Sequence, residues 1–167
     1  MSEYEAKLKA YIREHGIDAR HLSFNQSTHS VEEASRAVGA EPQDFVKSIC
    51  MIAGDDNLVV AIVKGEDRAS TGRVSKALGV EGVRVARPEE ILEKTGYPVG
   101  GTPAFGYPAA FLMDPRVMER DLVYSGGGSD TALTYLAPRE MLRANDGKVV
   151  RVRKKTPRPL SLFVNQV

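Results

Sequence analysis

A glycine- and proline-rich loop at residues 97–108 is the segment of this sequence best suited to chemistry. It holds three prolines and three glycines in twelve residues, together with aromatic side chains, which is too irregular for a helix or a sheet ladder. Because glycine lacks a Cβ atom and tolerates positive φ, Gly100 and Gly101 can bring backbone N–H groups close to a ligand. Such donors stabilise the oxyanion that develops during ester hydrolysis. A plain surface turn is the commoner alternative.

Lys47 is a second candidate, because it opens the otherwise largely apolar segment at residues 46–53. In a strand it shares one face of the pleat with Ile49 and Met51. A compact ammonium at the mouth of a covered strand can hold a phosphate or polarise a carbonyl. The alternative is a lysine that extends from a sheet edge into water.

Cys50 and the three histidines do not indicate a nucleophile or a metal site. Cys50 lies between two apolar residues and is expected to be a buried hydrophobic side chain. A single cysteine excludes an internal disulfide, and the histidines lack zinc-ligand spacing. No G-x-S-x-G, G-x-G-x-x-G or P-loop motif occurs. We therefore expect no metal and no cofactor.

Capping residues and apolar patterns predict the elements that position these groups. Helices are predicted from a Ser2 capping box to Gly16, from Ser30 to Gly39, and at residues 70–78, 88–94 and 138–144. Strands are predicted at residues 21–25, 46–53, 58–63, 82–86, 110–113, 122–125 and 131–136. The second and third of these strands are apolar on both faces, so they should be central and covered. The pattern predicts an α+β fold with a central mixed, largely antiparallel sheet flanked by helices.

Composition is that of an ordinary globular chain. The 167 residues fit one domain, with 42% apolar and 27% charged residues. No apolar stretch approaches the ~18 residues of a membrane span, and the N-terminus lacks the features of a signal peptide. We therefore expect no membrane association and a cytoplasmic protein. The net charge of +1 does not by itself indicate a nucleic-acid binder.

Basic residues are concentrated near the C-terminus, and no acidic residue follows Gly147. They are Lys148, Arg151, Arg153, Lys154, Lys155 and Arg158. This run is suited to phosphate contacts, although a solvated tail or a charged edge strand is an equally good interpretation.

The order of the segments resembles the YbaK and prolyl-tRNA-synthetase-associated (ProX-like) family of aminoacyl-tRNA editing domains. The motifs that carry the resemblance are Phe45-Val46-Lys47-Ser48-Ile49, Gly100 to Gly106, Met113-Asp114 and Ser125 to Ser129. It implies an editing domain over residues 1–146, and it does not cover the rest of the chain, so residues 147–167 are expected to be a basic C-terminal extension. It also implies a free-standing deacylase that removes a mischarged small amino acid, such as alanine or cysteine, from the 3′ end of a tRNA, with tRNA for proline as one candidate. The alternative is a non-catalytic module that binds the aminoacylated or nucleotide 3′ end.

The resemblance also assigns roles to residues of this chain. It implies catalytic roles for Lys47, Gly100 and Gly101. Substrate contacts are implied for His29, Thr102, Pro103, Phe105, Gly106, Asp114, Gly128 and Ser129. Contacts with the tRNA backbone are expected for Lys64, Arg151, Arg153, Lys154 and Lys155. Structural alternatives are a turn and cap residue for Asp114, a hairpin turn for Gly128 and a solvated strand end for Lys64. Ala104 and Tyr107 stand where the family often has proline and histidine, so the amino acid accepted is left open, as is the oligomeric state.

Overall fold

The two longest apolar segments form neighbouring strands at the centre of the fold. The computed structural model describes residues 2–155. In it, β2 (Val46–Ile52) and β3 (Leu58–Lys64) pair antiparallel through a turn at residues 54–57. Alternate side chains of β3 enter two different core clusters, Leu58, Val60 and Ile62 one of them and Val59, Ala61 and Val63 the other. Both faces of β3 are therefore covered, as predicted.

The strands divide between two sheets, with mixed and largely antiparallel pairing. The five-stranded sheet has the order β4-β2-β3-β5-β8, with β4 at Arg84–Val85, β5 at Ala110–Met113 and β8 at Lys148–Val149. β5 is parallel to both β3 and β8, and β4 is antiparallel to β2. The three-stranded sheet has the antiparallel order β1-β7-β6, with β1 at Ala19–Ser23, β7 at Ala132–Leu136 and β6 at Val123–Gly126. The predicted α+β class is confirmed, but one central sheet is replaced by two.

A single parallel bridge between Phe45 and Tyr124 links the two sheets. Pairing of β2 with β6 does not continue beyond it, because β6 packs there against the glycine-rich loop. A Cβ atom at Gly126 would lie 2.7 Å from the carbonyl carbon of Thr102. The two strands therefore separate after the bridge.

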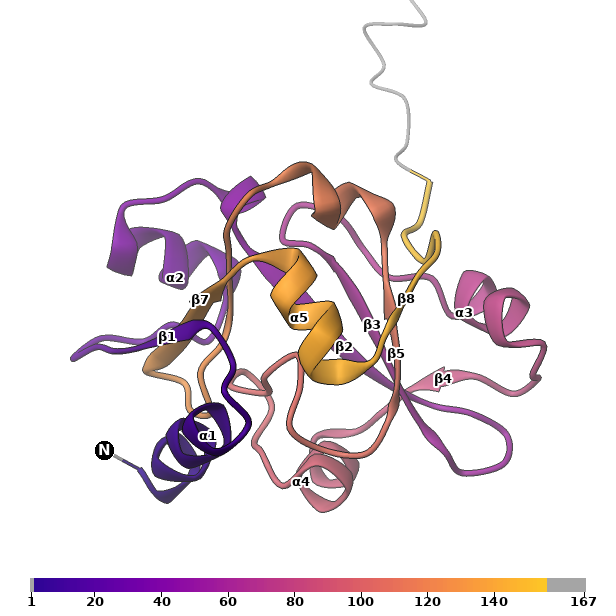
Figure 1. Ribbon diagram of the computed structural model, residues 1–167. Coiled ribbons are helices and arrows are strands. Elements are labelled where there is room, and N and C mark those ends of the chain that lie inside the picture. Colours follow the sequence, from indigo (N-terminus) through magenta and orange to yellow (C-terminus); the bar gives the residue numbers. More distant parts are fainter. Residues whose placement is uncertain (1, 156–167) are drawn as a thin grey trace, which may run out of the picture.

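Helices cover both faces of the five-stranded sheet (Figure 1). α1 (Glu3–Glu14), α4 (Pro88–Thr95) and α5 (Pro138–Asn145) contribute Leu8, Ile91 and Met141 to one core cluster. α3 (Thr71–Leu78) covers the other face through Val74, and α2 (Val31–Val38) packs through Ala34 on Leu133 of the three-stranded sheet. The N-caps predicted for the first two helices, Ser2 and Ser30, are confirmed, and Ser70 caps α3 in the same way. No helix among residues 2–155 is long and apolar enough to cross a membrane.

The first part of the predicted C-terminal extension is built into the domain. β8 was not predicted, yet it pairs with β5. Val152 is fully buried, and its carbonyl accepts the N–H of Ser70 at 2.7 Å. A bridge between Ala69 and Arg153 lies beside this bond. Residues 148–155 are therefore held against the start of α3, whereas Arg158 lies outside the described residues.

Candidate active site

A cavity of about 790 Å³ opens where β2 and β6 separate. Its volume falls within the range of roughly 300–1,000 Å³ that is typical of small-molecule sites. The start of β2, the N-terminal end of α2, the glycine-rich loop and the end of β6 form its walls. The residues that line it include His29, Lys47, Ser48, Gly100, Thr102 and Ser125.

The first half of β2 presents an open strand edge to the cavity. β3 pairs with β2 along its whole length, whereas β4 pairs only with Met51 and Ile52. The carbonyl of Cys50 accepts the N–H of Ala86 at 2.9 Å, so it points to the β4 side. Because backbone groups alternate between the two sides of a strand, the N–H and C=O of Ser48 point to that same side. A ligand in the cavity therefore meets backbone donors and acceptors of β2.

Lys47 lines this cavity and is partly buried. Burial lowers the pKa of its ammonium group, the positive charge of Arg68 lowers it further, and the carboxylate of Asp67 acts in the opposite direction. Among residues 2–155 no carboxylate lies within 4.0 Å of this ammonium. Its charge is therefore available to an anionic or strongly polar ligand.

Gly100 places backbone atoms, without a side chain, at the cavity wall. Its φ of +86° is in the region that favours glycine. His29 packs against it so closely that no side chain fits between them. The N–H groups of Gly100 and Thr102 have no protein acceptor among the described residues. These two groups are the free donors that an oxyanion site needs at this point of the loop.

Gly101 has a different place in the loop from the one predicted. Its N–H donates to the carbonyl of Pro98 at 3.1 Å, and its own carbonyl accepts the N–H of Gly128 at 2.7 Å. A Cβ atom at Gly101 would lie 2.5 Å from the backbone nitrogen of Ser129. Gly101 is buried and its N–H is already bonded, so it shapes the loop and offers no donor to a ligand.

Four carbonyl groups of the loop accept side-chain donors, and the first is that of Tyr97, which accepts the hydroxyl of Thr95 at 3.1 Å. The hydroxyl of Tyr107 donates to Pro103 at 2.6 Å, and that of Thr102 donates to Pro98 at 3.0 Å. The amide of Asn145 donates to the carbonyl of Ala104 at 2.9 Å. These bonds fix the backbone before a ligand arrives, as electrostatic stabilisation of a transition state requires.

Several residues assigned to substrate contact lie outside the cavity wall. Phe105 is fully buried in the core, and Pro103 is buried beside it. Gly106 packs against the ring of Tyr11, and Gly128 against the backbone of Tyr4. Aromatic and proline side chains in this loop pack into the interior because the loop is covered by α1. These residues therefore support the loop from the interior and do not form the cavity wall.

Ser129 is also turned away from the cavity, towards α1. Its hydroxyl donates to the carboxylate of Glu5 at 2.8 Å, and Ser23 donates to the same carboxylate at 2.7 Å. Burial acts to raise the pKa of Glu5, but these two hydrogen bonds, together with the backbone of Ser2 and the charge of His21, lower it below its ordinary value. Glu5 looks in the sequence like an ordinary capping residue, and no local signal reveals this contact.

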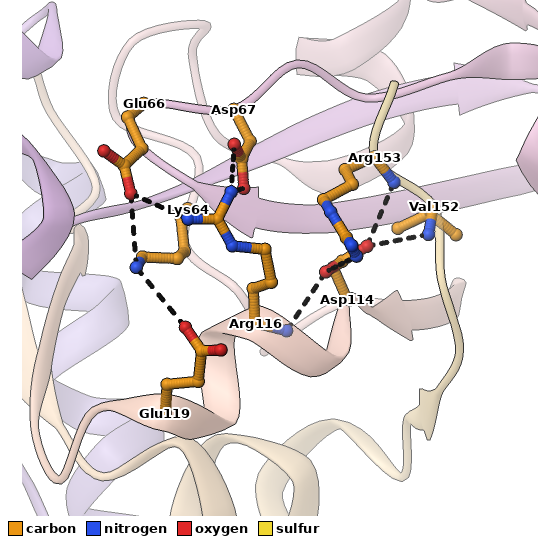
Figure 2. A network of polar contacts seen from close by, with 8 residues as sticks. All are labelled: Lys64, Glu66, Asp67, Asp114, Arg116, Glu119, Val152 and Arg153. Atoms are coloured by element: carbon orange, nitrogen blue, oxygen red, sulfur yellow. Dashed lines mark hydrogen bonds and ion pairs between the residues drawn. The ribbon is translucent and has the colours of Figure 1, made fainter. Parts of the chain in front are cut away.

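Asp114 anchors the C-terminal segment (Figure 2). Its fully buried carboxylate accepts the N–H groups of Val152 and Arg153, both at 3.0 Å. It also pairs with the guanidinium of Arg153 at 2.9 Å. Burial acts to raise the pKa of Asp114, but the backbone donors and the charge of Arg153 together lower it below its ordinary value. Asp114 thus does not line the cavity, and the expected substrate contact is replaced by a structural one.

Lys64 fits neither of the two interpretations of the sequence, a contact with the tRNA backbone or a solvated strand end. It is buried and pairs with Glu66 at 3.2 Å and Glu119 at 3.7 Å. Figure 2 shows Arg116 beside this pair, where it also bonds Asp67 at 2.7 Å. Because carboxylates neutralise the charges of both Lys64 and Arg116, these ion pairs hold the turn after β3 next to Lys47.

The basic segment lies beside that same turn. The backbone N–H of Lys154 donates to the carbonyl of Arg68 at 2.7 Å, and Arg68 is close enough to Lys47 to affect its pKa. Lys154 and Lys155 are exposed, whereas Arg153 is engaged by Asp114 and Arg151 is partly buried. The free positive charge of residues 151–155 is thus mostly on the two lysines.

Sequence reasoning missed two serines in the cavity wall. The hydroxyl groups of Ser48 and Ser125 are buried and have no partner among residues 2–155. The available signal was a hydroxyl residue inside each of two otherwise apolar strands. No group of three or more His, Cys, Asp or Glu side chains in the described part of the chain is arranged to hold a metal ion.

The sequence model of the aminoacyl-tRNA editing domain family matches residues 25–144, and the chain belongs to this family. Uncharacterized protein YwhH of Bacillus subtilis is 26% identical over 129 residues, which cover 75% of this chain and 81% of that protein. Proline–tRNA ligase of Thermotoga maritima is 29% identical over 103 residues, which are 61% of this chain but only 18% of the ligase. A crystal structure described as a candidate trans-editing enzyme for prolyl tRNA synthetase has a TM-score of 0.86, with 26% identity, 93% of this chain covered and 99% of that chain. The family and fold predicted from the sequence are confirmed.

Proposed function

We propose that this protein is an aminoacyl-tRNA deacylase that acts in trans and hydrolyses a mischarged small amino acid from the 3′ end of tRNA. The observation that carries the proposal is that one cavity is lined by Lys47, Gly100 and Thr102, whose ammonium and N–H groups have no protein partner in the part of the chain that the structure describes. Membership of the editing-domain family supports the choice of substrate.

The geometry is suited to an ester that is already reactive. An aminoacyl ester needs a positioned water molecule and a stabilised oxyanion rather than a strong nucleophile. In this proposal the loop N–H groups bind the developing oxyanion, and each such donor contributes roughly 10²–10³ in rate. The ammonium of Lys47 binds the terminal phosphate or the ester carbonyl and orients the substrate. Water then attacks the carbonyl carbon, and the bond between that carbon and the ribose oxygen breaks. The ribose oxygen takes up a proton from the attacking water and leaves as a hydroxyl group.

Action in trans and a small substrate also have support. The structure described as a candidate trans-editing enzyme for prolyl tRNA synthetase matches this chain over 99% of its length. We propose alanine or cysteine as the amino acid that is removed. The tRNA for proline is a candidate carrier, because proline–tRNA ligases contain a similar segment.

A panel of mischarged tRNAs tests the proposal directly. Release of labelled amino acid is measured for each, with correctly charged prolyl-tRNA as the reference. We expect selective hydrolysis of at least one small mischarged amino acid. Tight binding of these tRNAs with no release above the uncatalysed rate would contradict the proposal and identify a binding module instead.

A further inference from the structure

His21 in β1 is a half-buried side chain that does not line the cavity. Its Nε2 atom lies 2.8 Å from the carbonyl oxygen of Gly127. Because a carbonyl oxygen accepts hydrogen bonds and does not donate them, Nε2 carries the hydrogen in this contact. Gly127 lies in the turn that joins β6 to β7. The imidazole of His21 therefore holds one particular peptide group of that turn.

The peptide group held by His21 is also bonded to the glycine-rich loop. The carbonyl of Gly127 and the N–H of Gly128 belong to one planar trans peptide group, so they point in opposite directions. The N–H of Gly128 donates to the carbonyl of Gly101 at 2.7 Å. That carbonyl shares its peptide group with the N–H of Thr102, which therefore points away from the turn. Two successive peptide groups thus connect His21 to a donor of the cavity wall that has no acceptor among residues 2–155.

The turn itself is closely packed on two sides. A Cβ atom at Gly127 would lie 2.6 Å from the carbonyl oxygen of Ala132 in β7, and one at Gly128 would lie 3.0 Å from the carbonyl oxygen of Tyr4 in α1. Because packing this close leaves little room for adjustment, a rotation of the turn is passed on to the loop. Hydrogen bonds that share a peptide group also polarise one another, which makes the last N–H a stronger donor.

We propose that His21 is a positioning residue that orients the N–H of Thr102 towards the developing oxyanion through these two peptide groups. This inference rests on the proposed deacylase function and adds to it a residue outside the cavity. Without the imidazole, the carbonyl of buried Gly127 loses its side-chain donor, so its peptide group turns and the bond from Gly128 weakens. A small displacement of an oxyanion donor is enough to slow the reaction.

The test measures kcat and KM of His21→Leu and His21→Gln on the mischarged tRNA that is hydrolysed fastest in the panel. His21→Leu should lower kcat about ten- to a hundred-fold and change KM by less than about three-fold, because the lost interaction acts on the transition state. The amide nitrogen of glutamine is the same number of bonds from the backbone as Nε2 of histidine. His21→Gln therefore keeps a donor and should recover most of the rate.

Thr134→Val is the matched control for a general loosening of the turn. The hydroxyl of Thr134 donates to the carbonyl of Gly126 at 3.0 Å. The N–H in that peptide group belongs to Gly127 and makes no bond to the loop in the described part of the chain. Thr134→Val should lower the Tm by about 2–4 °C and leave kcat within about two-fold. Equal losses of kcat in Thr134→Val and His21→Leu would overturn the inference.

Hydrogen exchange of the Gly128 amide, followed by NMR, tests the connection without hydrolysis. This amide should exchange about ten-fold faster or more in His21→Leu than in Thr134→Val or the unmodified protein. Faster exchange supports the connection even if no ester is cleaved, in which case only the deacylase proposal fails. Unchanged exchange, normal kcat in folded His21→Leu, or no recovery in His21→Gln would each contradict the role of His21.

Discussion

The imidazole of His29 packs against Gly100 so closely that a Cβ atom at residue 100 would lie 2.5 Å from its Cε1 atom. This contact joins the segment before α2 to the glycine-rich loop at the cavity wall. Any side chain at residue 100 must displace either the histidine or the loop.

Gly100→Ala should therefore lower deacylase kcat/KM by about a hundred-fold or more, since it moves a loop donor. Its positive φ should also lower stability by ~1–2 kcal/mol. Gly79→Ala is the control, because Gly79 has a φ of +66° with no atom within 4 Å of the added Cβ. Gly79→Ala should lose similar stability and keep its activity, as judged by kinetics and thermal melting. Equal activity losses in the two variants would show that strain alone is responsible.

The charge of Lys47 gives activity a pH dependence. Burial and Arg68 lower its pKa from the ordinary value of 10.5, so the rate should fall as pH rises through that lowered pKa. The unfolded chain binds this proton more tightly, so the group destabilises the fold below the lowered pKa. That penalty disappears as pH rises from the lowered pKa towards 10.5.

Substitutions at two neighbouring residues should shift, in opposite directions, the pH at which kcat/KM falls (the alkaline limb of the pH profile). Arg68→Gln removes a positive charge and should move it to higher pH, whereas Asp67→Asn should move it to lower pH. The measurement is kcat/KM against pH, corrected for spontaneous hydrolysis of the ester. A limb that stays in place in both variants would show that another group titrates.

Local sequence signals predicted most elements of the fold because each element depends on nearby residues. Ser30 caps α2, and the two-sided apolar pattern of β3 marks a covered strand. Long-range polar contacts carry no such signal. Nothing near Glu5 or Asp114 indicates that their carboxylates bind partners 124 and 38 residues away. The sequence singled out the loop, of which Gly100 and Thr102 line the cavity, but which of its N–H groups are free depends on packing against the turn after β6.

Cys50→Ala should fold and keep deacylase activity within a few-fold of the unmodified protein. The side chain is only 3% exposed, and burial raises the pKa of its thiol to about 12. It therefore lacks the thiolate form at neutral pH. The small gap left should cost about 1 kcal/mol of stability. A loss of more than about a hundred-fold in turnover with unchanged melting would revive a thiol mechanism.

The basic C-terminal segment is expected to contact tRNA phosphates through Lys154 and Lys155. Truncation before residue 148 is unsuitable as a test, because it removes buried Val152 and the partners of Asp114. Instead, both lysines are changed to glutamine and tRNA affinity is measured against salt. The slope of log affinity against log salt should become shallower by about 1.4–1.8 if two phosphate contacts are lost.

The control for this variant changes two basic residues elsewhere. Lys9 and Arg13 are exposed on α1, and Figure 1 shows α1 on the opposite side of the molecule from the C-terminal segment. Their double change to glutamine should leave the slope unaltered. Identical slopes for the lysine variant and the unmodified protein would exclude the phosphate contacts.

The most direct test of the account is kcat/KM of Lys47→Ala on a mischarged tRNA, paired with thermal melting. Lys47 is partly buried and forms no ion pair among residues 2–155, and burial disfavours its charge, so its removal should lower stability by no more than about 0.5 kcal/mol. Loss of its charged contact should lower kcat/KM by roughly 10²–10³. Lys47→Arg should also fail, because a planar guanidinium does not replace a compact ammonium. Near-normal turnover by folded Lys47→Ala would contradict the proposed mechanism.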